Sequence, residues 1–329
     1  MKKIKLNIIV PSLVQGGGLR IIFSYANYLV EQGHDVVVYV PVLYVWPKVR
    51  NNKINWKTSA GNFLRSNKLK WFDNKFKIKS VFKISDTYIR NADIVIATAW
   101  QTAQTVYDLD DTKGKKVYFI QGYEVDNEGI NKQEVEDSYK LGMNMFTIAN
   151  WLEELVEAIS EQEVKVIRNW TKDSEFIQGE KQVNSPRAII MLGNTAAHKG
   201  WNLGLEVLKK AQEKYNCRII LYGVRQIPDI PESFEFYQQP KRELLMKLYS
   251  EADICLFPSI REGWGLTVTE AMAHKCAIVG NNTGIVLEIC EDGKTALISE
   301  SKTAKDLKNK LFKVIEDEKL MKKLQDNGY

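Results

Sequence analysis

The sequence lacks any apolar run approaching the roughly 20 residues that a membrane-spanning helix needs. Its lysine-rich start resembles a signal peptide, but Pro11 and a glycine-rich loop end the apolar stretch early, so we expect a first strand there. The four cysteines show no Cys-x-x-Cys spacing, which favours buried free thiols in a cytosolic protein over a disulfide framework. The three histidines are isolated along the chain, so we expect no metal site and no metal cofactor.

A chain of 329 residues is long enough for two domains, each with its own core. The net charge of +5 is unevenly distributed. Residues 48–90 hold twelve Lys or Arg against Asp73 and Asp86, a segment charge of +10, so the remainder is mildly acidic. Aromatic residues lie between these lysines, and residues 46–90 therefore have two interpretations. They form either a solvated surface with aromatics reaching the core, or a patch that binds anionic membrane lipids. Nucleic acid is a weaker third option, since no recognition motif is present.

The first half begins with a strand–glycine loop–helix–strand pattern. Residues 6–10 read as a buried strand, residues 11–20 as a loop containing Gly16, Gly17 and Gly18, and residues 36–40 as the next strand. Open α/β sheets bind ligands at such loops. A nicotinamide-binding fingerprint fails, however, because Ile21 stands at its third glycine position and no acidic residue follows the second strand.

Further strands are predicted over residues 92–97, 116–120, 146–149 and 164–167, with a helix over residues 151–160. Polar or amphipathic residues follow two of these strands, and Trp100, Gln121 and Glu124 are candidates for contact with an acceptor. A polar run then breaks the pattern. We expect an N-terminal domain over residues 1–170, a linker over 171–186 and a C-terminal domain over 187–329.

The second half repeats the α/β pattern. Strands are expected over residues 188–192, 218–222, 234–237, 254–257, 277–279 and 296–299, and helices over residues 202–215 and 241–250, from about residue 266, and over 303–324. The stretch from Asp253 to Ala273 is the most informative. Its strand ends at Pro258, its loop holds Glu262, Gly263 and Gly265, and its helix carries Glu270.

A helix that opens directly after a strand points its free N–H groups and its positive dipole end at the space above that strand, which suits a diphosphate. Glu262 and Glu270 would repel such an anion. They are better suited to accept hydrogen bonds from sugar hydroxyls. A site that places hydrogen-bond donors for a diphosphate beside acceptors for sugar hydroxyls is suited to a nucleotide sugar.

The second half resembles the nucleotide-sugar domain of glycosyltransferase family 4, whose GT-B fold consists of two facing Rossmann-like domains. The resemblance rests on motifs in a fixed order: Gly193 to Lys199-Gly200, Tyr222-Gly223, Ala252-Asp253, Pro258-Ser259, Glu262-Gly-Trp-Gly-Leu266, Glu270-Ala-Met-Ala273 and Thr283-Gly284 with Glu288. The first half resembles the acceptor domain through its glycine loop. Residues 119–124 are similar to bacterial polysaccharide transferases, rhamnosyltransferases among them.

The resemblance implies a role for each matching residue. Glu270 would hold the ribose hydroxyls, Glu262 would face the donor sugar and the reacting carbon, and Lys199 would bind the diphosphate. Other positions expected at the donor are Gly193, Asn194, Gly223, Arg261, Gly263, Gly265 and Leu266, with Gly16, Gly17 and Gly18. The family usually has arginine where this chain has Asn194, so either backbone N–H groups or a cation such as Arg261 would assist Lys199.

The resemblance implies one class of reaction and leaves two alternatives open. We expect a retaining hexosyltransferase that moves sugar from a nucleotide-diphosphate donor to a glycan or lipid-linked glycan, in polysaccharide or glycoconjugate synthesis. We expect it in the cytoplasm, peripheral on the inner membrane face. One alternative is a catalytically inactive homologue that acts as a binding partner, which Asn194 and the chain end at Tyr329 favour. The other is a sugar-nucleotide epimerase on the same fold.

Overall fold

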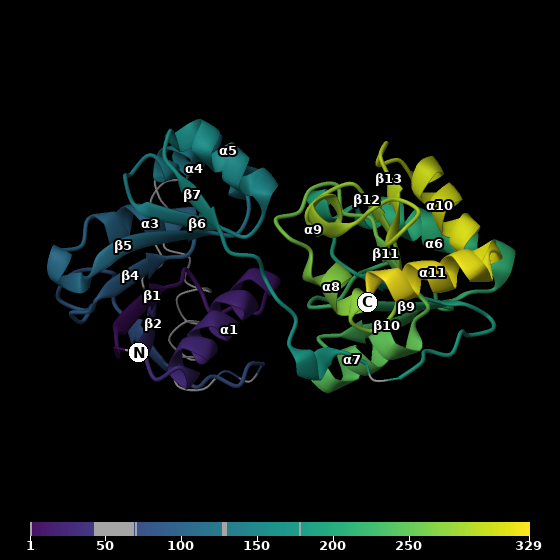
Figure 1. Cartoon of the computed structure of the whole chain (residues 1–329), viewed down its shortest axis with the longest axis horizontal. Coiled ribbons are helices and arrows are strands. Elements are labelled where there is room, and N and C mark those ends of the chain that lie inside the picture. The colour runs from purple at the N-terminus through teal and green to yellow at the C-terminus, as the bar shows by residue number, and fades with distance from the viewer. Residues whose placement is uncertain (1, 43–68, 70, 127–129, 178) are drawn as a thin grey trace. The chain divides into compact units, whose positions relative to one another are not determined.

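The computed structural model describes all residues except 1, 43–68, 70, 127–129 and 178. The chain divides into two compact units, Met1–Asn169 and Trp170–Tyr329. Each unit consists of a parallel sheet with helices packed against it (Figure 1). The fold class is therefore α/β with two Rossmann-like units, as the alternation of strands and helices predicted.

The described residues of the first unit form a seven-stranded sheet in the order β3-β2-β1-β4-β5-β6-β7, and neighbouring strands pair in parallel. The strand order reverses at β1, which lies between β2 and β4. The strands are β1 (Lys5–Ile9), β2 (Asp35–Pro41), β3 (Lys77–Val81), β4 (Ile94–Ala97), β5 (Lys115–Ile120), β6 (Asn144–Thr147) and β7 (Val164–Val166). The helices are α1 (Gly17–Glu31), α3 (Trp100–Tyr107), α4 (Lys132–Tyr139) and α5 (Asn150–Ser160).

The sequence analysis missed three elements of this unit and overestimated the length of one loop. The strand β3 lies within the basic segment and was not predicted, and neither were α3 and α4. The glycine loop is shorter than expected, because α1 begins at Gly17 and the N–H of Arg20 already donates to the carbonyl oxygen of Gly16 at 3.0 Å. The first helical turn therefore includes two of the three glycines.

In the basic segment, residues 46–90, the described residues include aromatics that pack inward and an exposed surface that carries lysines. Trp71, Phe72 and Phe76 pack on Phe23 of α1, with ring centroids 5.0–5.6 Å from that of Phe23. Phe76 is buried in the core, and Trp71 and Phe72 are partly exposed at its edge. Phe82 is exposed, as are the nearby lysines Lys77, Lys79 and Lys83. Tyr88 is also exposed, whereas Trp46, Trp56 and Phe63 lie outside the described residues.

The described residues of the second unit form a six-stranded parallel sheet in the order β10-β9-β8-β11-β12-β13. The strands are β8 (Ala188–Leu192), β9 (Arg218–Gly223), β10 (Glu235–Gln238), β11 (Ile254–Phe257), β12 (Ala277–Asn281) and β13 (Ala296–Ser299). The helices are α6 (Trp201–Tyr215), α7 (Arg242–Glu251), α8 (Leu266–Met272), α9 (Ile285–Ile289), α10 (Ala304–Glu316) and α11 (Glu318–Gly328).

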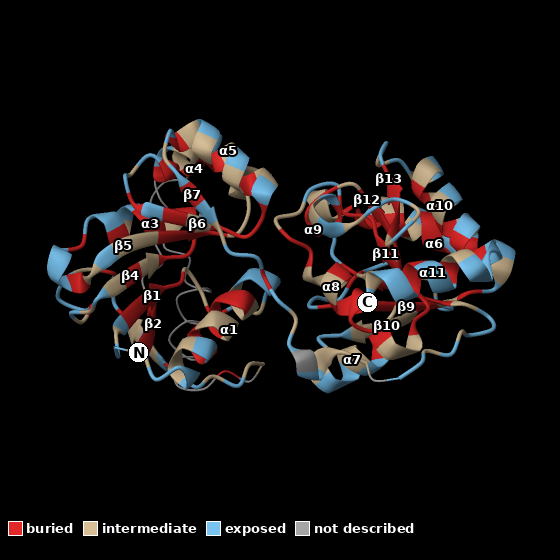
Figure 2. Ribbon diagram, in the orientation of Figure 1, coloured by how far each residue is buried: buried red, intermediate tan, exposed pale blue. Residues whose placement is uncertain are grey.

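The core of this unit follows the alternation of side chains along each strand. Odd-numbered residues of β8 and β9 and even-numbered residues of β11 share one buried cluster with α6, α10 and α11, as do Ala277, Val279 and Leu297. Figure 2 shows the buried strands between half-exposed helices. The last two helices were expected to be one. They separate at Asp317, whose side chain accepts the N–H of Leu320 and so caps α11.

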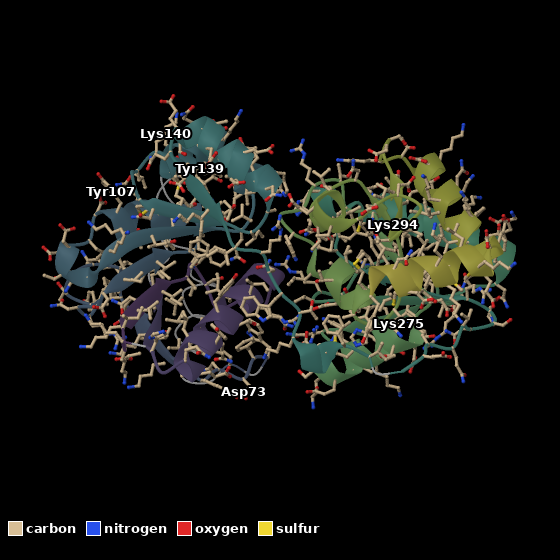
Figure 3. All side chains as sticks on the ribbon, in the orientation of Figure 1. Asp73, Tyr107, Tyr139, Lys140, Lys275 and Lys294 are labelled. Atoms are coloured by element: carbon tan, nitrogen blue, oxygen red, sulfur yellow. The ribbon has the colours of Figure 1, made fainter. Side chains whose placement is uncertain are left out.

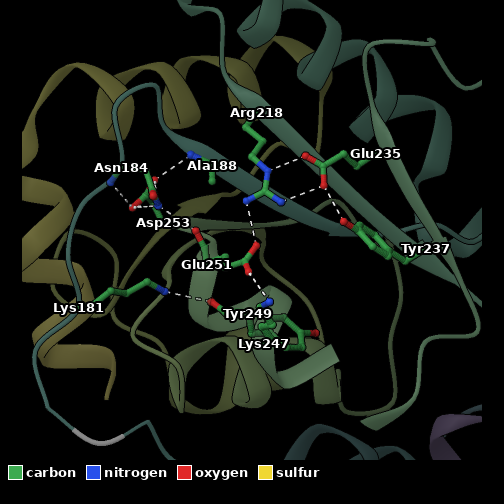
Figure 4. Close-up of polar contacts among 10 residues, drawn as sticks. All are labelled: Lys181, Asn184, Ala188, Arg218, Glu235, Tyr237, Lys247, Tyr249, Glu251 and Asp253. Atoms are coloured by element: carbon green, nitrogen blue, oxygen red, sulfur yellow. Dashed lines mark hydrogen bonds and ion pairs between the residues drawn. The ribbon is translucent and has the colours of Figure 1, made fainter. Parts of the chain in front are cut away.

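Polar side chains link the amino ends of the strands in the second unit. The carboxylate of Asp253, directly before β11, accepts the N–H groups of Asn184 at 3.0 Å and of Ala188 at 2.8 Å (Figure 4). Lys181 donates to the carbonyl oxygens of Tyr249 and His274. The segment over residues 171–186, expected to be a linker, therefore packs on the second unit.

Candidate nucleotide-sugar site

The candidate site of the second unit lies where its strand order reverses. The neighbouring strands β8 and β11 run in parallel, and β8 leads into α6 while β11 leads into α8. Their carboxyl ends therefore meet at one edge of the sheet, the position at which open α/β sheets bind ligands. Lys199 follows the first of these strands and Glu262 follows the second.

Backbone contacts hold these two loops together. The carbonyl oxygen of His198 accepts the N–H of Ile260 at 2.8 Å and that of Arg261 at 3.2 Å. Gly200 has φ of +64°, and a Cβ there would lie 2.0 Å from the carbonyl oxygen of Pro258. Only glycine fits this approach, because both the backbone conformation and the space exclude a side chain. The loops are consequently fixed with their functional residues side by side.

The side chains of Lys199 and Glu262 form an ion pair in this position. The Nζ atom of Lys199 lies 2.7 Å from Oε1 and 2.6 Å from Oε2 of Glu262, and the hydroxyl of Ser259 lies 3.3 Å from Oε2. The side chains are 19% and 15% exposed, so the pair is shielded and still reachable. A cation able to contact phosphate oxygens therefore lies beside a carboxylate able to accept hydrogen bonds from hydroxyls.

The predicted glycines mark close approaches of backbone around this pair. The N–H of Gly193 donates to the carbonyl oxygen of Tyr222 at 2.7 Å, and a Cβ on Gly223 would lie 2.5 Å from the carbonyl oxygen of Gly193. The ends of β8 and β9 thus have no room for side chains. Gly265, with φ of +107°, precedes the first residue of α8, Leu266. Gly263 lies in the same loop, directly after Glu262.

Asn194 shapes its own loop. Its side-chain oxygen accepts the N–H of Ala196 at 3.0 Å, a short-range turn that asparagine often forms. The residue at this position therefore stabilises the loop that carries Lys199. Arg261 enters the site region through its backbone contact with His198.

Glu270 is 5% exposed on α8 and is paired with Arg242, the first residue of α7. The Nη1 atom of the arginine lies 2.7 Å from Oε1 of Glu270. Tyr222 and Tyr249 lie nearby, with their hydroxyls 2.5 Å apart. Burial raises the pKa of both tyrosines well above its usual value, and the charge of Glu270 raises it further. The glutamate is therefore a buried carboxylate with a cationic partner in Arg242 and two neutral phenols beside it.

In the first unit the predicted acceptor residues lie at the carboxyl edge of the sheet. Gly16 caps α1, and Gly18 packs against Gln121, whose amide nitrogen would be 3.4 Å from a Cβ on the glycine. One carboxylate oxygen of Glu124 accepts the N–H of Trp100 at 2.9 Å, at the start of α3. The ring of Trp100 is buried in the core.

Burial also changes the ionisation of Glu124. It raises the pKa of this carboxyl to about 7, while the hydrogen bond from Trp100 opposes the shift. Tyr118 and Tyr139 lie close to the carboxylate, since its charge raises the pKa of both phenols. Tyr139 ends α4, next to exposed Lys140 (Figure 3). Glu124 is thus a half-buried carboxyl that changes charge near neutral pH.

Comparison with known proteins identifies the second unit. Residues 173–329 match the family model of the glycosyl transferases group 1. The match covers nearly the whole of the second unit, Trp170–Tyr329. The resemblance inferred from the ordered motifs is confirmed, and the family model covers all three residues of the candidate site, Lys199, Glu262 and Glu270.

Relatives and solved structures agree with this assignment. The chain is 30% identical over 167 residues to the N,N'-diacetylbacillosaminyl-diphospho-undecaprenol alpha-1,3-N-acetylgalactosaminyltransferase of Campylobacter jejuni, 46% of this chain and 44% of that protein. It is 27% identical over 158 residues to the capsular polysaccharide biosynthesis glycosyltransferase CapM of Staphylococcus aureus, 45% of this chain and 42% of that protein. The chain thus spans about half the length of the curated relatives it matches.

Structural likeness extends over both units. HepE of Anabaena, solved with UDP-glucose, aligns with a TM-score of 0.72 at 13% identity, covering 99% of this chain and 93% of that one. WaaG, a glycosyltransferase of lipopolysaccharide biosynthesis, aligns with a TM-score of 0.69 at 14% identity, covering 98% and 94%. At such identities the likeness establishes the fold. The predicted GT-B fold is confirmed.

Two residues of the site escaped the sequence analysis. Arg242 directly follows a Pro-Lys pair at a helix start, a pattern that indicates the helix and gives no sign of a partner in α8. Ser259 was noted within a motif without a role, and its hydroxyl contacts Glu262. Within the described residues, no group of three His, Cys, Asp or Glu side chains is arranged to hold a metal ion. No helix in that same part of the chain is long and apolar enough to cross a membrane.

Proposed function

We propose that this protein is a glycosyltransferase that moves a hexose-type sugar from a nucleotide-diphosphate sugar to a glycan acceptor, with retention at the anomeric carbon. The observation that carries the proposal is the contact between Lys199 and Glu262 at the switch point of the second sheet. The two residues lie 63 positions apart in the sequence, and the fold brings their charged groups within 2.6 Å.

The proposed chemistry assigns one task to each group. Cleavage between the anomeric carbon and the diphosphate leaves negative charge on phosphate oxygens, which the ammonium of Lys199 and nearby backbone N–H groups stabilise. Glu262 accepts hydrogen bonds from the sugar hydroxyls, and Glu270 accepts those of the ribose. When the donor binds, the lysine exchanges part of its contact with Glu262 for the phosphate. We assign the charge neutralisation to this lysine and propose no metal cofactor.

Variants of the paired residues test this function. Lys199→Ala should reduce sugar transfer at least 100-fold, since a single well-placed donor contributes about 3–4 kcal/mol to the transition state. Glu262→Gln, which removes a charged acceptor from the sugar hydroxyls, should also reduce transfer, by roughly 10- to 100-fold. The matched controls are Lys210→Ala and Glu213→Gln, an exposed ion pair on α6 in the same unit, which should transfer sugar at the unmodified rate. Full transfer by both site variants, with folding confirmed by circular dichroism, would refute the proposal.

The donor and the stereochemistry can be measured directly. Thermal-shift screening with UDP-, GDP- and dTDP-sugars identifies the nucleotide, because a ligand at 100 times its dissociation constant stabilises the folded protein by about 2.7 kcal/mol. The anomeric configuration of the product, read by NMR, distinguishes retention from inversion. Turnover of the donor without any acceptor would instead indicate an epimerase.

We further propose that the acceptor is a glycan or lipid-linked glycan and that the enzyme works at the cytoplasmic membrane face. The name of the Campylobacter relative, which specifies an undecaprenol-linked substrate, supports this. So do exposed Phe82 with Lys77, Lys79 and Lys83 on and after the edge strand β3. Lysines also protect an edge strand from aggregation, so flotation with anionic and neutral liposomes decides between the roles. Flotation with neither kind of liposome would favour a soluble acceptor.

A catalytically inactive homologue that binds a partner is the second candidate. The observation in its favour is Asn194, whose side chain contacts its own loop where the resemblance leads us to expect an arginine. Nucleotide binding without transfer or donor hydrolysis, across the screened sugars and acceptors, would support this candidate.

A further inference from the structure

Arg242 contacts two carboxylates that come from distant parts of the second unit. Its Nη1 atom lies 2.7 Å from Oε1 of Glu270 on α8. Its Nε atom donates to Oε1 of Glu175 at 3.1 Å, and its Nη2 atom lies 2.7 Å from Oε2 of the same residue. Glu175 lies in the segment that leads into this unit, 67 positions before the arginine. The guanidinium therefore contacts Glu175 with Nε and Nη2, and Glu270 with Nη1.

This geometry leaves the arginine little freedom. A planar guanidinium that donates a hydrogen bond to one carboxylate and lies against it with a second nitrogen has a restricted orientation, which a lysine cannot reproduce. The side chain of Arg242 is 27% exposed and that of Glu270 is 6% exposed, so both lie largely out of water. A buried carboxylate needs a hydrogen-bonding partner to stay charged. Glu175 thus orients Arg242, and Arg242 orients Glu270.

The orientation of Glu270 matters because of what the proposed function requires from it. A carboxylate has about four acceptor positions, and the contact with Arg242 uses one of them on Oε1. This contact restricts the orientation of the carboxylate relative to α8. Two vicinal ribose hydroxyls form a rigid pair of donors, which a carboxylate held in one plane can recognise together.

We infer that Arg242, positioned by Glu175, makes the nucleotide site selective for a ribonucleoside diphosphate over its 2′-deoxy counterpart by fixing the carboxylate plane of Glu270. The inference rests on the proposed function, since it assumes that Glu270 binds the ribose. It names the donor class as a UDP-, GDP- or ADP-sugar and disfavours deoxythymidine donors. Arg242 is a positioning residue in this scheme and touches no substrate.

A hydroxyl that donates to a charged acceptor usually changes affinity by roughly 10- to 100-fold. The unmodified protein should therefore bind UDP or GDP, whichever is tighter, at least 10-fold better than the 2′-deoxy form of the same nucleotide. In Arg242→Gln this ratio should fall to about 1–3, because the carboxylate loses its fixed plane. Arg242→Lys should restore part of the charge and little of the ratio, and Glu175→Gln should give an intermediate value.

The second unit contains a matched control. Arg218 contacts Glu235 through Nε at 2.6 Å and Nη2 at 2.9 Å, and Glu251 through Nη1 at 3.0 Å, the same arrangement at the amino end of β9. Arg218→Gln removes an equivalent pair of contacts away from the candidate site. It should leave the ribose-to-deoxyribose ratio unchanged, whatever it does to stability.

The experiment is isothermal titration of the full chain with the two nucleotides, after circular dichroism confirms folding of each variant. A ratio unchanged in Arg242→Gln, or in Glu175→Gln if the arginine variant fails to fold, would overturn the inference. Equal binding of both nucleotides by the unmodified protein would also overturn it. Glu270→Gln separates the two levels: if it removes the ratio while Arg242→Gln does not, the inference fails and the proposed function stands. If Glu270→Gln leaves the ratio intact, the ribose role of Glu270 fails as well.

Discussion

Replacing Glu124 with glutamine should change how the stability of this protein depends on pH. Burial raises the pKa of this carboxyl from 4.5 to about 7 in the folded chain. Between these values the folded protein holds a proton that the unfolded chain has lost. Stability from this group is therefore fully present below pH 4.5 and declines as pH rises through 7. The difference corresponds to about 3 kcal/mol in total, of which about 2 kcal/mol falls between pH 5.5 and pH 8.

Glutamine has nearly the same shape as the protonated glutamic acid, its oxygen can accept the N–H of Trp100, and it does not titrate. Urea unfolding of the full chain at pH 5.5 and pH 8 should therefore show the variant gaining about 2 kcal/mol over the unmodified protein at the higher pH. Because the main cause is burial rather than a neighbouring charge, raising the salt from 0.1 to 0.5 M should leave this gain unchanged. A stability difference that is the same at both pH values would refute the reasoning.

Three further predictions concern the second unit. Gly200→Ala should lower the free energy of unfolding by roughly 2–4 kcal/mol, because φ is positive there and the new Cβ would lie 2.0 Å from the carbonyl oxygen of Pro258; it should also weaken nucleotide binding. The control is Gly142→Ala, where φ is +76° and nothing lies within 4 Å of the Cβ. It should show only the smaller loss of stability that the backbone conformation causes. Asp253→Asn should destabilise by roughly 3 kcal/mol in urea unfolding, because an amide donor would face the N–H groups of Ala188 and Asn184. Burial lowers the pKa of His274 below its usual value of 6.5. As pH falls below about 6.5, the unfolded chain therefore binds a proton before the folded chain does, and the free energy of unfolding declines. His274→Gln should reduce this decline in urea unfolding measured across that pH range.

The sequence predicted the second unit more accurately than the first. The bounds of β8, β11 and β13 were predicted to the residue, because each strand is a short buried apolar run ended by glycine, proline or polar residues. The edge strand β3 reads Lys-Ile-Lys-Ser-Val and faces solvent with its lysines, so it carries a weak hydrophobic signal. Helix α4 is largely polar and buries few of its residues. Elements that bury little apolar surface have only a weak hydrophobic pattern in the sequence, so they are hard to predict from it.

The candidate site was predictable to the extent that it lies in ordered motifs. Lys199, Glu262 and Glu270 each follow or open an element with a clear pattern, and parallel strands place their loops at one edge. The partners of Glu270 were not predictable, since Arg242 is 28 positions away and Glu175 is 67 positions from the arginine. Such contacts depend on how α7 and the incoming segment pack, and local sequence does not encode that packing. Likewise, the raised pKa of Glu124 depends on the burial that packing produces.

Two arginines of the second unit make similar contacts at opposite edges of its sheet, and we expect different roles for them. Arg218 and Arg242 each hold two glutamates with the same three nitrogens. Arg218 lies at the amino end of β9, where its side chain is 37% exposed and its contacts join the starts of strands (Figure 4). Solvent screens such pairs, so their contribution to stability is modest. Arg242 meets a carboxylate that is 6% exposed, on a helix that opens at the carboxyl edge where ligands bind. The same cluster of charges thus links strands at one edge, and under our proposal it orients a ribose-binding carboxylate at the other. Substitution at the two positions should then separate stability from nucleotide selectivity.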